Sequence, residues 1–452
     1  MITKIEVDGF KSLSDFTLEL HSGLNILVGP NGSGKTNIIL FFEFLSQLTT
    51  NPIAHSVSAI GGAGAIFRKK GERDYNEDIK FKIYGSKSYQ DDDTITYEYE
   101  ATITTSFEKD SIYYSQQHLR FRSGKKFWKS PEEKGYSKPK WDFSVSYINE
   151  ENLKAEVQLH SLNEKKIEAR HIYRSDEGKE KLEDTIIEHV KESSPSIRNI
   201  IGCLFPIADM SVFSINSDLQ GGETFNIVPS KVKEQEDAAT PAGIKKDGSG
   251  LATTLYAMKR SKSKSPNNNR FRYYFDTPEK TYDPNTLKKI VSYLKLANKT
   301  IVDLDVENDP FDNKLVVKIF IEAEDSGAVL PLSAMSDGTI KWLSLITAIL
   351  TSRTIFSIEE PENFLHPWMQ AEIANIMRNH LREKTEPSLV LMTTHSESLL
   401  NHSEPNEVIL VDLESGITNA RRIEDINLIK EEIANSGFGL GHFYFSNVFE
   451  NE

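Results

Sequence analysis

The chain has 452 residues and a mass of 51.2 kDa, and 38% of its residues are hydrophobic while 27% are charged. This length allows two or three domains with packed cores, so a small disulfide-stabilised domain and a wholly disordered chain are excluded. The single cysteine, Cys203, cannot form an internal disulfide or a thiolate zinc site and fits a reducing cytosol. No apolar run approaches the roughly 18 residues of a membrane span, so we expect a cytoplasmic protein without membrane contact.

Charge is distributed unevenly along the chain. With 53 Lys and Arg against 67 Asp and Glu, the net charge of −14 repels nucleic acid overall. Residues 120–140 and 259–272 are nevertheless locally basic, so these two segments are the candidates for DNA contact. In residues 120–140 aromatic side chains alternate with basic ones, as in segments that combine phosphate contact with base stacking. The alternative, which we favour, is a solvated strand pair whose aromatic side chains face the core.

The first fifty residues predict strands, then a loop, then a helix. Alternating apolar residues indicate strands near residues 5–7 and 16–20, and a third strand at 24–28 precedes a Gly-rich loop and a helix that continues to about residue 45. Between residues 55 and 310 the pattern loosens into shorter elements. We expect strands at 79–84, 94–104 and 143–148 and helices at 180–191 and 284–297. No sustained heptad repeat is present, so we expect no long coiled coil.

Regular alternation of strands and helices returns near residue 311. The expected elements are a strand at 315–321, a helix at 337–350, a strand at 355–358, a helix at 367–381 and strands at 389–393 and 408–413. Such alternation is typical of parallel sheets. We therefore expect an α/β fold whose mixed, largely parallel sheet comes from residues 1–70 and 311–452, split by an α+β insertion at 71–310.

A phosphate-binding loop follows the third strand. Residues 29–36 match the pattern G-x-x-x-x-G-K-S/T, directly after a predicted strand and directly before a helix. Its glycines let backbone N–H groups surround a β-phosphate, Lys35 supplies positive charge, and the Thr36 hydroxyl is a ligand for Mg²⁺. The remaining loop residues expected at the phosphates are Gly29, Asn31, Gly32, Ser33 and Gly34. The sequence therefore predicts binding of ATP with Mg²⁺.

Hydrolysis needs carboxylates at the end of a neighbouring strand. The apolar strand at 355–358 ends in Glu359 and Glu360, at the edge where parallel sheets bind ligands. We assign Glu359 to the metal shell, through water, and Glu360 to orienting and deprotonating the attacking water. Because Lys35 and Glu360 are far apart in the sequence, the insertion is expected to separate two halves of one site.

Two further motifs give the pattern a family resemblance. Residues 336–339 open a helix shortly before Glu359, and His395 stands at the end of a later strand. This arrangement resembles the ABC-type P-loop ATPases of the RecF, SMC and overcoming-lysogenization-defect (OLD) kind. The resemblance implies that Ser336 and Gly338 bind the ATP of a partner subunit and that His395 senses the γ-phosphate. Glu359 replaces the usual Asp of this family. The sequence does not place the family's nucleotide-side glutamine, for which Gln116 and Gln117 are only two of the options.

The resemblance narrows when longer segments are compared. Four motifs, at residues 247–252, 332–339, 359–367 and 393–396, look like a branch of ATPases close to the OLD enzymes. That branch includes the ATPase subunits of the antiphage systems Septu and PARIS, and the resemblance covers roughly residues 1–70 and 240–450. The residues after His395 lack the spaced carboxylates of a two-metal nuclease, so the chain looks like an ATPase without a nuclease of its own.

Three functions remain open from the sequence. The first is a homo-oligomeric ATPase that sandwiches ATP between subunits and regulates a separate effector, a nuclease, in antiphage defence. The second is a RecF-like ATPase that binds duplex DNA in repair or replication. The third is a scaffold that binds nucleotide without hydrolysis, against which the intact Lys35, Thr36 and Glu360 argue.

Overall fold

The computed structural model describes most of the chain. The described residues are 1–71, 74–89, 93–106, 110–123, 140–148, 152–160, 179–204, 210–261, 282–322, 327–352, 355–384 and 387–446. The chain divides into two compact units. The first comprises Met1–Glu223, Lys384–Leu391 and Glu407–Ile423, and the second comprises Thr224–Glu383, Met392–Asn406 and Glu424–Glu452. No helix among the described residues is both long and apolar enough to cross a membrane.

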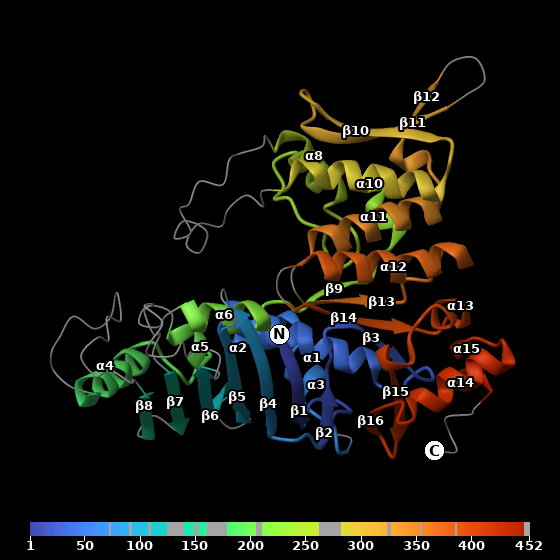
Figure 1. Ribbon diagram of the computed structural model, residues 1–452. Helices are drawn as coiled ribbons and strands as arrows, with labels where there is room; N and C mark the ends of the chain where they lie inside the picture. The colour runs from blue at the N-terminus through green and yellow to red at the C-terminus, as the bar shows by residue number, and fades with distance from the viewer. Residues whose placement is uncertain are drawn as a thin grey trace, which may run out of the picture. The chain divides into compact units, whose positions relative to one another are not determined.

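A seven-stranded antiparallel sheet forms much of the first unit (Figure 1). In spatial order its strands are β2 (Phe16–Glu19), β1 (Ile2–Asp8), β4 (Asp78–Tyr89), β5 (Asp93–Ser106), β6 (Ser111–Ser123), β7 (Lys140–Ile148) and β8 (Asn152–His160). Alternation along β5 places Tyr97, Tyr99 and Ala101 in the core, as the two-residue period of a half-buried strand requires. β1 and β4 are paired in register, for example Ile5 with Ile83.

Helices of the first unit supply aromatic side chains to its core. They are α1 (Lys35–Thr50), α2 (Ile53–Ala59), α3 (Ala63–Ile66), α4 (Lys179–Glu192), α5 (Ile200–Cys203) and α6 (Met210–Leu219). Phe41 of α1 packs edge-on against Phe10 and against Phe81 of β4, with ring centroids 5.4 and 5.8 Å apart. All three side chains are buried, so α1, which begins in the Gly-rich loop, is held firmly by this core.

A second group of strands in the first unit includes the strand that leads into the Gly-rich loop. β3 (Gly23–Val28) pairs in parallel with β15 (Val408–Glu414), and β15 pairs antiparallel with β16 (Ile417–Arg422). Every residue of β3 from Leu24 to Val28 is buried, including the polar Asn25 that interrupts its apolar run. Of the pairings described within each unit, β3 with β15 is parallel whereas those of the seven-stranded sheet are antiparallel, so the fold is α/β with mixed sheets.

The second unit stacks helices in layers. Its elements are β9 (Glu223–Phe225, from its second residue), α7 (Pro229–Val232), α8 (Leu251–Arg260), α10 (Pro284–Ala297), β10 (Ile301–Asp309), β11 (Lys314–Ile321), β12 (Ala328–Pro331), α11 (Asp337–Thr351), β13 (Ile355–Glu359), α12 (Pro367–Glu383), α13 (Glu397–Asn401), α14 (Ile426–Ser436) and α15 (Leu440–Phe445). The strand β14 (Leu389–Thr394) is divided between the units after Leu391. α10 packs on α11 and α11 on α12, beside the three-stranded antiparallel sheet β10-β11-β12 (Figure 1). Trp342 of α11 is fully buried, and its indole N–H donates to the Tyr293 carbonyl of α10 at 2.8 Å.

The C-terminal helix α15 docks on α13 through glycines. A Cβ at Gly439 would lie 2.3 Å from Oδ1 of Asn401, and one at Gly441 would lie 2.6 Å from the Glu397 carbonyl. The Gly441 N–H donates to Oδ1 of Asn401 at 2.8 Å. Glycine is therefore required at Gly441 by the Glu397 backbone and at Gly439 by the Asn401 side chain, because neither leaves room for a Cβ.

Gln117 of β6 is part of the core and makes four hydrogen bonds there. Its Nε2 donates to the carbonyls of Pro195 and Arg198, and its Oε1 accepts from the Ile200 N–H and the Tyr99 hydroxyl, at distances from 2.6 to 2.9 Å. Because these four bonds use both ends of the amide, Gln117 joins the loop before α5 to the sheet.

We expect Gln117→Met to lower the free energy of unfolding by roughly 3 kcal/mol, because it leaves several buried polar groups without partners. Urea unfolding measures this loss. The matched control is Gln116→Met, at the neighbouring exposed position, which should change stability by less than about 0.5 kcal/mol. Equal stability of the two variants would contradict the structural role of Gln117.

Candidate functional site

The Gly-rich loop is shaped as a phosphate cradle. It joins β3 to α1, and its glycines Gly32 and Gly34 have φ of 83° and 104°, values that L side chains rarely adopt. The N-cap position of α1 is Gly34, which offers no side-chain cap to the first N–H groups of the helix. Within the part of the chain that the structure describes, the buried Oγ of Ser33 has no hydrogen-bond partner. A loop of this kind presents backbone and hydroxyl donors to an anion.

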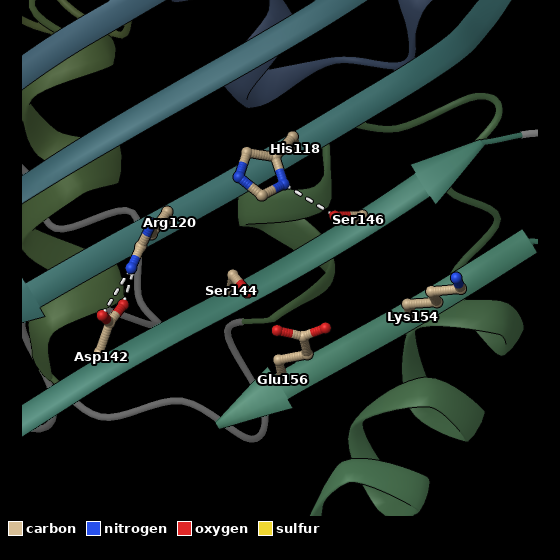
Figure 2. Close-up of a pocket in the computed structure, with 7 residues that line it drawn as sticks. All are labelled: His118, Arg120, Asp142, Ser144, Ser146, Lys154 and Glu156. Atoms are coloured by element: carbon tan, nitrogen blue, oxygen red, sulfur yellow. Dashed lines mark hydrogen bonds and ion pairs between the residues drawn. The ribbon is translucent and has the colours of Figure 1, made fainter. Parts of the chain in front are cut away.

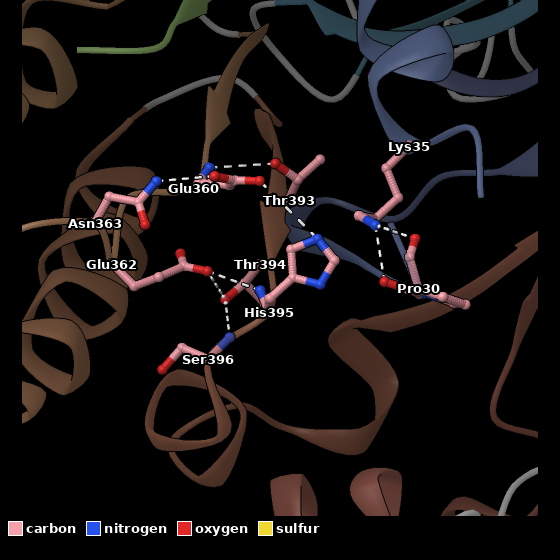
Figure 3. Close-up of polar contacts among 10 residues, drawn as sticks. Pro30, Lys35, Glu360, Glu362, Asn363, Thr393, Thr394, His395 and Ser396 are labelled. Carbon is pink, nitrogen blue, oxygen red and sulfur yellow. Dashed lines mark hydrogen bonds and ion pairs between the residues drawn. The ribbon is translucent and has the colours of Figure 1, made fainter. Parts of the chain in front are cut away.

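Lys35 is folded over the loop. It is 6% exposed, and its Nζ donates to the carbonyls of Gly29 and Pro30 at 2.8 and 2.9 Å (Figure 3). These carbonyls hold the ammonium over the first residues of the loop. Thr36 follows at the first turn of α1 with an exposed side chain, and Asn31 is exposed at the tip of the loop.

A polar network that no sequence motif indicates holds the loop in place. Oγ1 of Thr418, in β16, donates to the Ser33 carbonyl at 3.1 Å and lies 2.6 Å from the Ser12 hydroxyl. Asn37 Nδ2 donates to the same Ser12 hydroxyl at 2.6 Å. A Cβ on Gly34 would lie 1.9 Å from Oγ1 of Thr418, so this glycine is required by packing as well as by its φ. No local pattern links these residues, because they come from three distant segments.

In the second unit, β13 ends in the two predicted carboxylates. Glu359 is 9% exposed, whereas the Glu360 side chain is 45% exposed. Glu360 has a φ of 44°, a left-handed conformation that is strained for a residue with a Cβ. Its N–H donates to the carbonyl and the hydroxyl of Thr393 at 3.1 and 3.2 Å, and its Oε2 accepts from Asn363 at 2.8 Å (Figure 3). The carboxylate is therefore accessible, and its backbone is fixed.

His395 lies beside Glu360. Its Nε2 is 4.0 Å from Oε1 of Glu360, and its backbone N–H donates to Oε1 of Glu362 at 2.7 Å (Figure 3). The same Glu362 oxygen accepts from the Thr394 hydroxyl at 2.8 Å. Glu362 thus holds the strand end that carries the histidine. The spacing of three acids in residues 359–362 was the available signal for this residue.

The helix that begins after Ser336 is tied to the same turn. Oγ of Ser336 accepts from the Thr339 N–H at 3.2 Å, the capping bond that a Ser-Asp-Gly start predicts. A Cβ on Gly338 would lie 2.7 Å from the Phe364 carbonyl. Lys341, one turn further along α11, is 1% exposed and donates to the Glu360 carbonyl at 3.2 Å. Burial lowers the pKa of Lys341, although the nearby Glu362 and Glu360 carboxylates act in the opposite direction.

The structure thus gathers the predicted residues into two groups. Glu359, Glu360, His395, Ser336 and Gly338 belong to the second unit, where Glu360 and His395 are brought together and Gly338 approaches the turn after Glu360. The phosphate loop, Gly29 to Thr36, belongs to the first unit. Lys341 belongs to no sequence motif, and the signal for its interior polar role is a single charge among the buried residues of helix 337–350.

The sequence candidates outside these two groups include the two glutamines and the motif at 247–252. Gln117 is committed to the core, so it is unsuited to contact nucleotide, and Gln116 is exposed on the sheet. The motif at 247–252 forms a turn into α8, whose first N–H groups, of Gly250 and Thr253, donate to the Glu236 carboxylate at 2.6 and 2.9 Å. The positive end of the α8 helix dipole is therefore neutralised by a carboxylate of the same unit.

The described part of the basic segment 120–140 is paired internally. Arg120 donates two hydrogen bonds to the Asp142 carboxylate at 2.8 and 2.6 Å, and Arg122 lies 3.6 Å from the same carboxylate. Phe121 is buried and packs against Phe143, with ring centroids 4.8 Å apart. Figure 2 shows Arg120 and Asp142 in a polar surface pocket of about 270 Å³ over β6, β7 and β8. Residues 124–139, and 262–272 of the second basic segment, lie outside the described residues.

Each unit contributes one oxygen donor of the kind that Mg²⁺ prefers. The Thr36 hydroxyl belongs to the first unit and the Glu359 carboxylate to the second, and the ion usually takes one or two carboxylates together with phosphate and water oxygens. No cluster of three or more His, Cys, Asp or Glu side chains that could hold a metal occurs among the described residues.

Comparison with known proteins identifies similar chains. The profile of the AAA ATPase domain matches residues 1–400. Two DNA replication and repair proteins RecF, from Lactococcus lactis subsp. cremoris strains MG1363 and SK11, are each 31% identical to the chain over 70 residues. That stretch is 16% of this chain and 20% of each RecF protein, so the chain spans about a fifth of the length of the curated relatives it matches.

Comparison with solved structures finds SMC head domains. The SMC head bound to the C-winged helix domain of ScpA has a TM-score of 0.49 and 13% identity, covering 94% of this chain and 98% of that chain. The SMC head domain from Thermotoga maritima has a TM-score of 0.41 and 9% identity, covering 94% and 99% of the two chains.

We expect Gly34→Ala to destabilise the first unit by roughly 3 kcal/mol, because the new Cβ meets Thr418 in addition to the strain of a positive φ. The matched control is Gly32→Ala, which has a similar φ but no atom within 4 Å of the added Cβ. That control should lose only about 1 kcal/mol. Urea unfolding of both variants measures the difference, and equal losses would show that Thr418 does not constrain the loop.

Proposed function

Because the chain belongs to the AAA ATPase domain family, we propose that it binds and hydrolyses ATP between two subunits and thereby regulates a separately encoded effector protein. The observation that carries this proposal is the pair of half-sites: a phosphate loop with its buried lysine in one unit, and an accessible carboxylate beside a histidine in the other. A protein that only binds nucleotide has no need of the strained Glu360 backbone.

Each residue of the loop has a role that follows from its chemistry. The N–H groups at the start of α1 point toward the β-phosphate, and the Lys35 ammonium exchanges its carbonyl partners for β- and γ-phosphate oxygens. This exchange replaces two neutral carbonyl acceptors by anionic phosphate oxygens, so the ammonium gains an ion pair that favours the nucleotide-bound state. Thr36 and Glu359 would hold Mg²⁺, which when bound neutralises charge on the transferred phosphoryl group.

Glu360 acts on the attacking water. Its carboxylate accepts the proton of the water as the oxygen attacks the γ-phosphorus, and Asn363 keeps that carboxylate in place through its 2.8 Å bond. The His395 ring, 4.0 Å from Glu360, donates a hydrogen bond to a γ-phosphate oxygen and so reports whether that phosphate is present. Glu362 fixes the histidine backbone for this contact.

The helix α11, called the signature helix below, contacts the nucleotide that is held by a neighbouring copy of the chain. Ser336 is exposed at the N-terminus of α11, a helix of 15 residues, and its flank at Gly338 is shaped by the Phe364 carbonyl. An exposed helix N-terminus favours an anionic ligand. A homo-oligomer in which this helix faces the ATP held by another subunit's Lys35 would complete each site from two chains.

The effector is a nuclease in this proposal. The motifs at 332–339 and 359–367 resemble ATPase subunits of antiphage systems, in which a second protein would supply the cleavage. ATP-state-dependent contact with that protein is the mode of regulation. This assignment is tested by identifying the protein that is encoded next to the gene and the proteins that copurify with the chain.

A RecF-like ATPase that clamps duplex DNA is the second candidate. The 31% identity to RecF over 70 residues favours it. The pairing of Arg120 and Arg122 with Asp142 weakens it, because paired guanidinium groups contribute little to phosphate binding. Tight ATP-dependent duplex binding by the isolated chain would favour this candidate over effector regulation.

We expect Lys35→Ala and Glu360→Gln to impair ATP turnover in different ways. Loss of the ammonium should weaken ATP binding by roughly tenfold to a hundredfold. Glu360→Gln should retain binding but slow hydrolysis by roughly 10²- to 10⁴-fold and trap the ATP-bound assembly, because the amide cannot accept the water proton. Binding of a fluorescent ATP analogue and phosphate release measure the two effects.

The matched control for Glu360→Gln is Glu307→Gln, which removes an exposed carboxylate that pairs with Lys318 on the three-stranded sheet. It should leave ATP turnover unchanged. Hydrolysis by Glu360→Gln at the wild-type rate would show that the catalytic assignment is wrong.

We expect two inactive variants to restore activity when they are mixed. Lys35→Ala lacks the phosphate contact and Ser336→Arg blocks the signature helix, so a mixed dimer contains one intact composite site. Steady-state phosphate release from the mixture should exceed the sum of the separate variants. An absence of complementation, together with a rate per chain that stays constant on dilution to nanomolar concentrations, would indicate a site made by one chain.

A further inference from the structure

Lys341 is a buried cation whose position is not explained by the packing of its helix. It lies among the apolar residues of α11, with 1% of its surface exposed. Its Nζ donates to the carbonyl of Glu360 at 3.2 Å and lies 5.9 Å from the ring centroid of Phe364. Burying an ammonium costs free energy unless nearby groups compensate. Such a residue therefore needs a role beyond filling volume.

The segment that Lys341 contacts is a strained turn. Glu360 and Phe364, four residues apart, have φ of 44° and 68°, both in the left-handed region. Between them the Asn363 N–H donates to the Glu360 carbonyl at 3.3 Å. Two left-handed residues with side chains cost roughly 1–2 kcal/mol each. Contacts from outside must hold the turn in this conformation, and Lys341 supplies one at its first residue.

The turn from Glu360 to Phe364 also carries the groups that are proposed to act in hydrolysis. Glu360 contributes the base, and Glu362 holds the backbone of His395 through Oε1. From the other side, Gly338 of α11 approaches the Phe364 carbonyl, where no Cβ would fit. Helix α11 therefore contacts the turn at both ends: Lys341 contacts Glu360, and Gly338 contacts Phe364.

We propose that Lys341 is a positioning residue for hydrolysis: it anchors the Glu360 backbone to the signature helix, so that the Glu360 carboxylate is set in place by the helix that binds the neighbouring subunit's ATP. This inference rests on the proposed role of Glu360 as the base. It adds a physical link between the two ends of the composite site. Displacement of α11 by a neighbouring nucleotide would move the Glu360 carbonyl, and with it the carboxylate.

The test is Lys341→Met, which keeps the length and apolar stem of the side chain but removes the ammonium. The Glu360 carbonyl retains the Asn363 N–H, so the fold should persist. We expect kcat to fall about 10²-fold, as for a misplaced catalytic group, with the affinity for a fluorescent ATP analogue unchanged. The matched control is Lys289→Met, which removes an exposed lysine paired with Glu383 and should leave kcat unchanged.

A double variant separates positioning from a general structural effect. If Lys341 acts through Glu360, Lys341→Met should not slow the Glu360→Gln enzyme further. Losses that multiply, or wild-type kcat in Lys341→Met alongside a slow Glu360→Gln, would overturn the positioning role while leaving the proposed function intact. Wild-type turnover by Glu360→Gln would instead overturn the proposed function. Lys341→Gln is the second variant, and failure of both Lys341 variants to fold would assign the lysine to stability and overturn the proposal.

Discussion

The turn at the end of β13 must hold a charged, accessible side chain directly after a strand that is buried along its whole length. This constraint is met by a backbone that reverses at Glu360, with N–H bonded to Thr393 and carbonyl bonded to Lys341. Both partners are buried, so the bonds are shielded from water and hold the turn firmly. The geometry of Glu362, His395 and the start of α11 depends on this one reversal.

The backbone of the phosphate loop is likewise held by hydrogen bonds from other parts of the chain. Its glycines permit the tight backbone, but its position is held by Thr418 and Ser12. In both groups, the side chains proposed to face the nucleotide are recognisable as motifs, whereas supporting residues such as Thr418 and Lys341 lie outside these motifs. Loss of a supporting residue would therefore impair a site whose motif is intact.

Charge composition is a weaker guide to function than charge pairing in this chain. The segment at 120–140 is basic in sequence, but its described arginines face Asp142 from the adjacent strand. Phe121, between them, points to the core and packs on Phe143. Strand alternation explains both observations, because charged and aromatic residues that are neighbours in the sequence lie on opposite faces of a sheet.

The sequence by itself determined the elements with strong periodicity and the motifs beside them. The helix at 284–297 and the strands that precede the phosphate loop and Glu359 agree with the structure, because local apolar patterns specify such elements. It also placed the phosphate loop and Glu360 at element ends. Only the tertiary structure showed that Gln117 is committed to the core, that Gly34 packs against Thr418, and that Lys341 holds Glu360. These roles depend on hydrogen bonds and close contacts between segments that are far apart in the chain, and no local pattern of residues encodes such contacts.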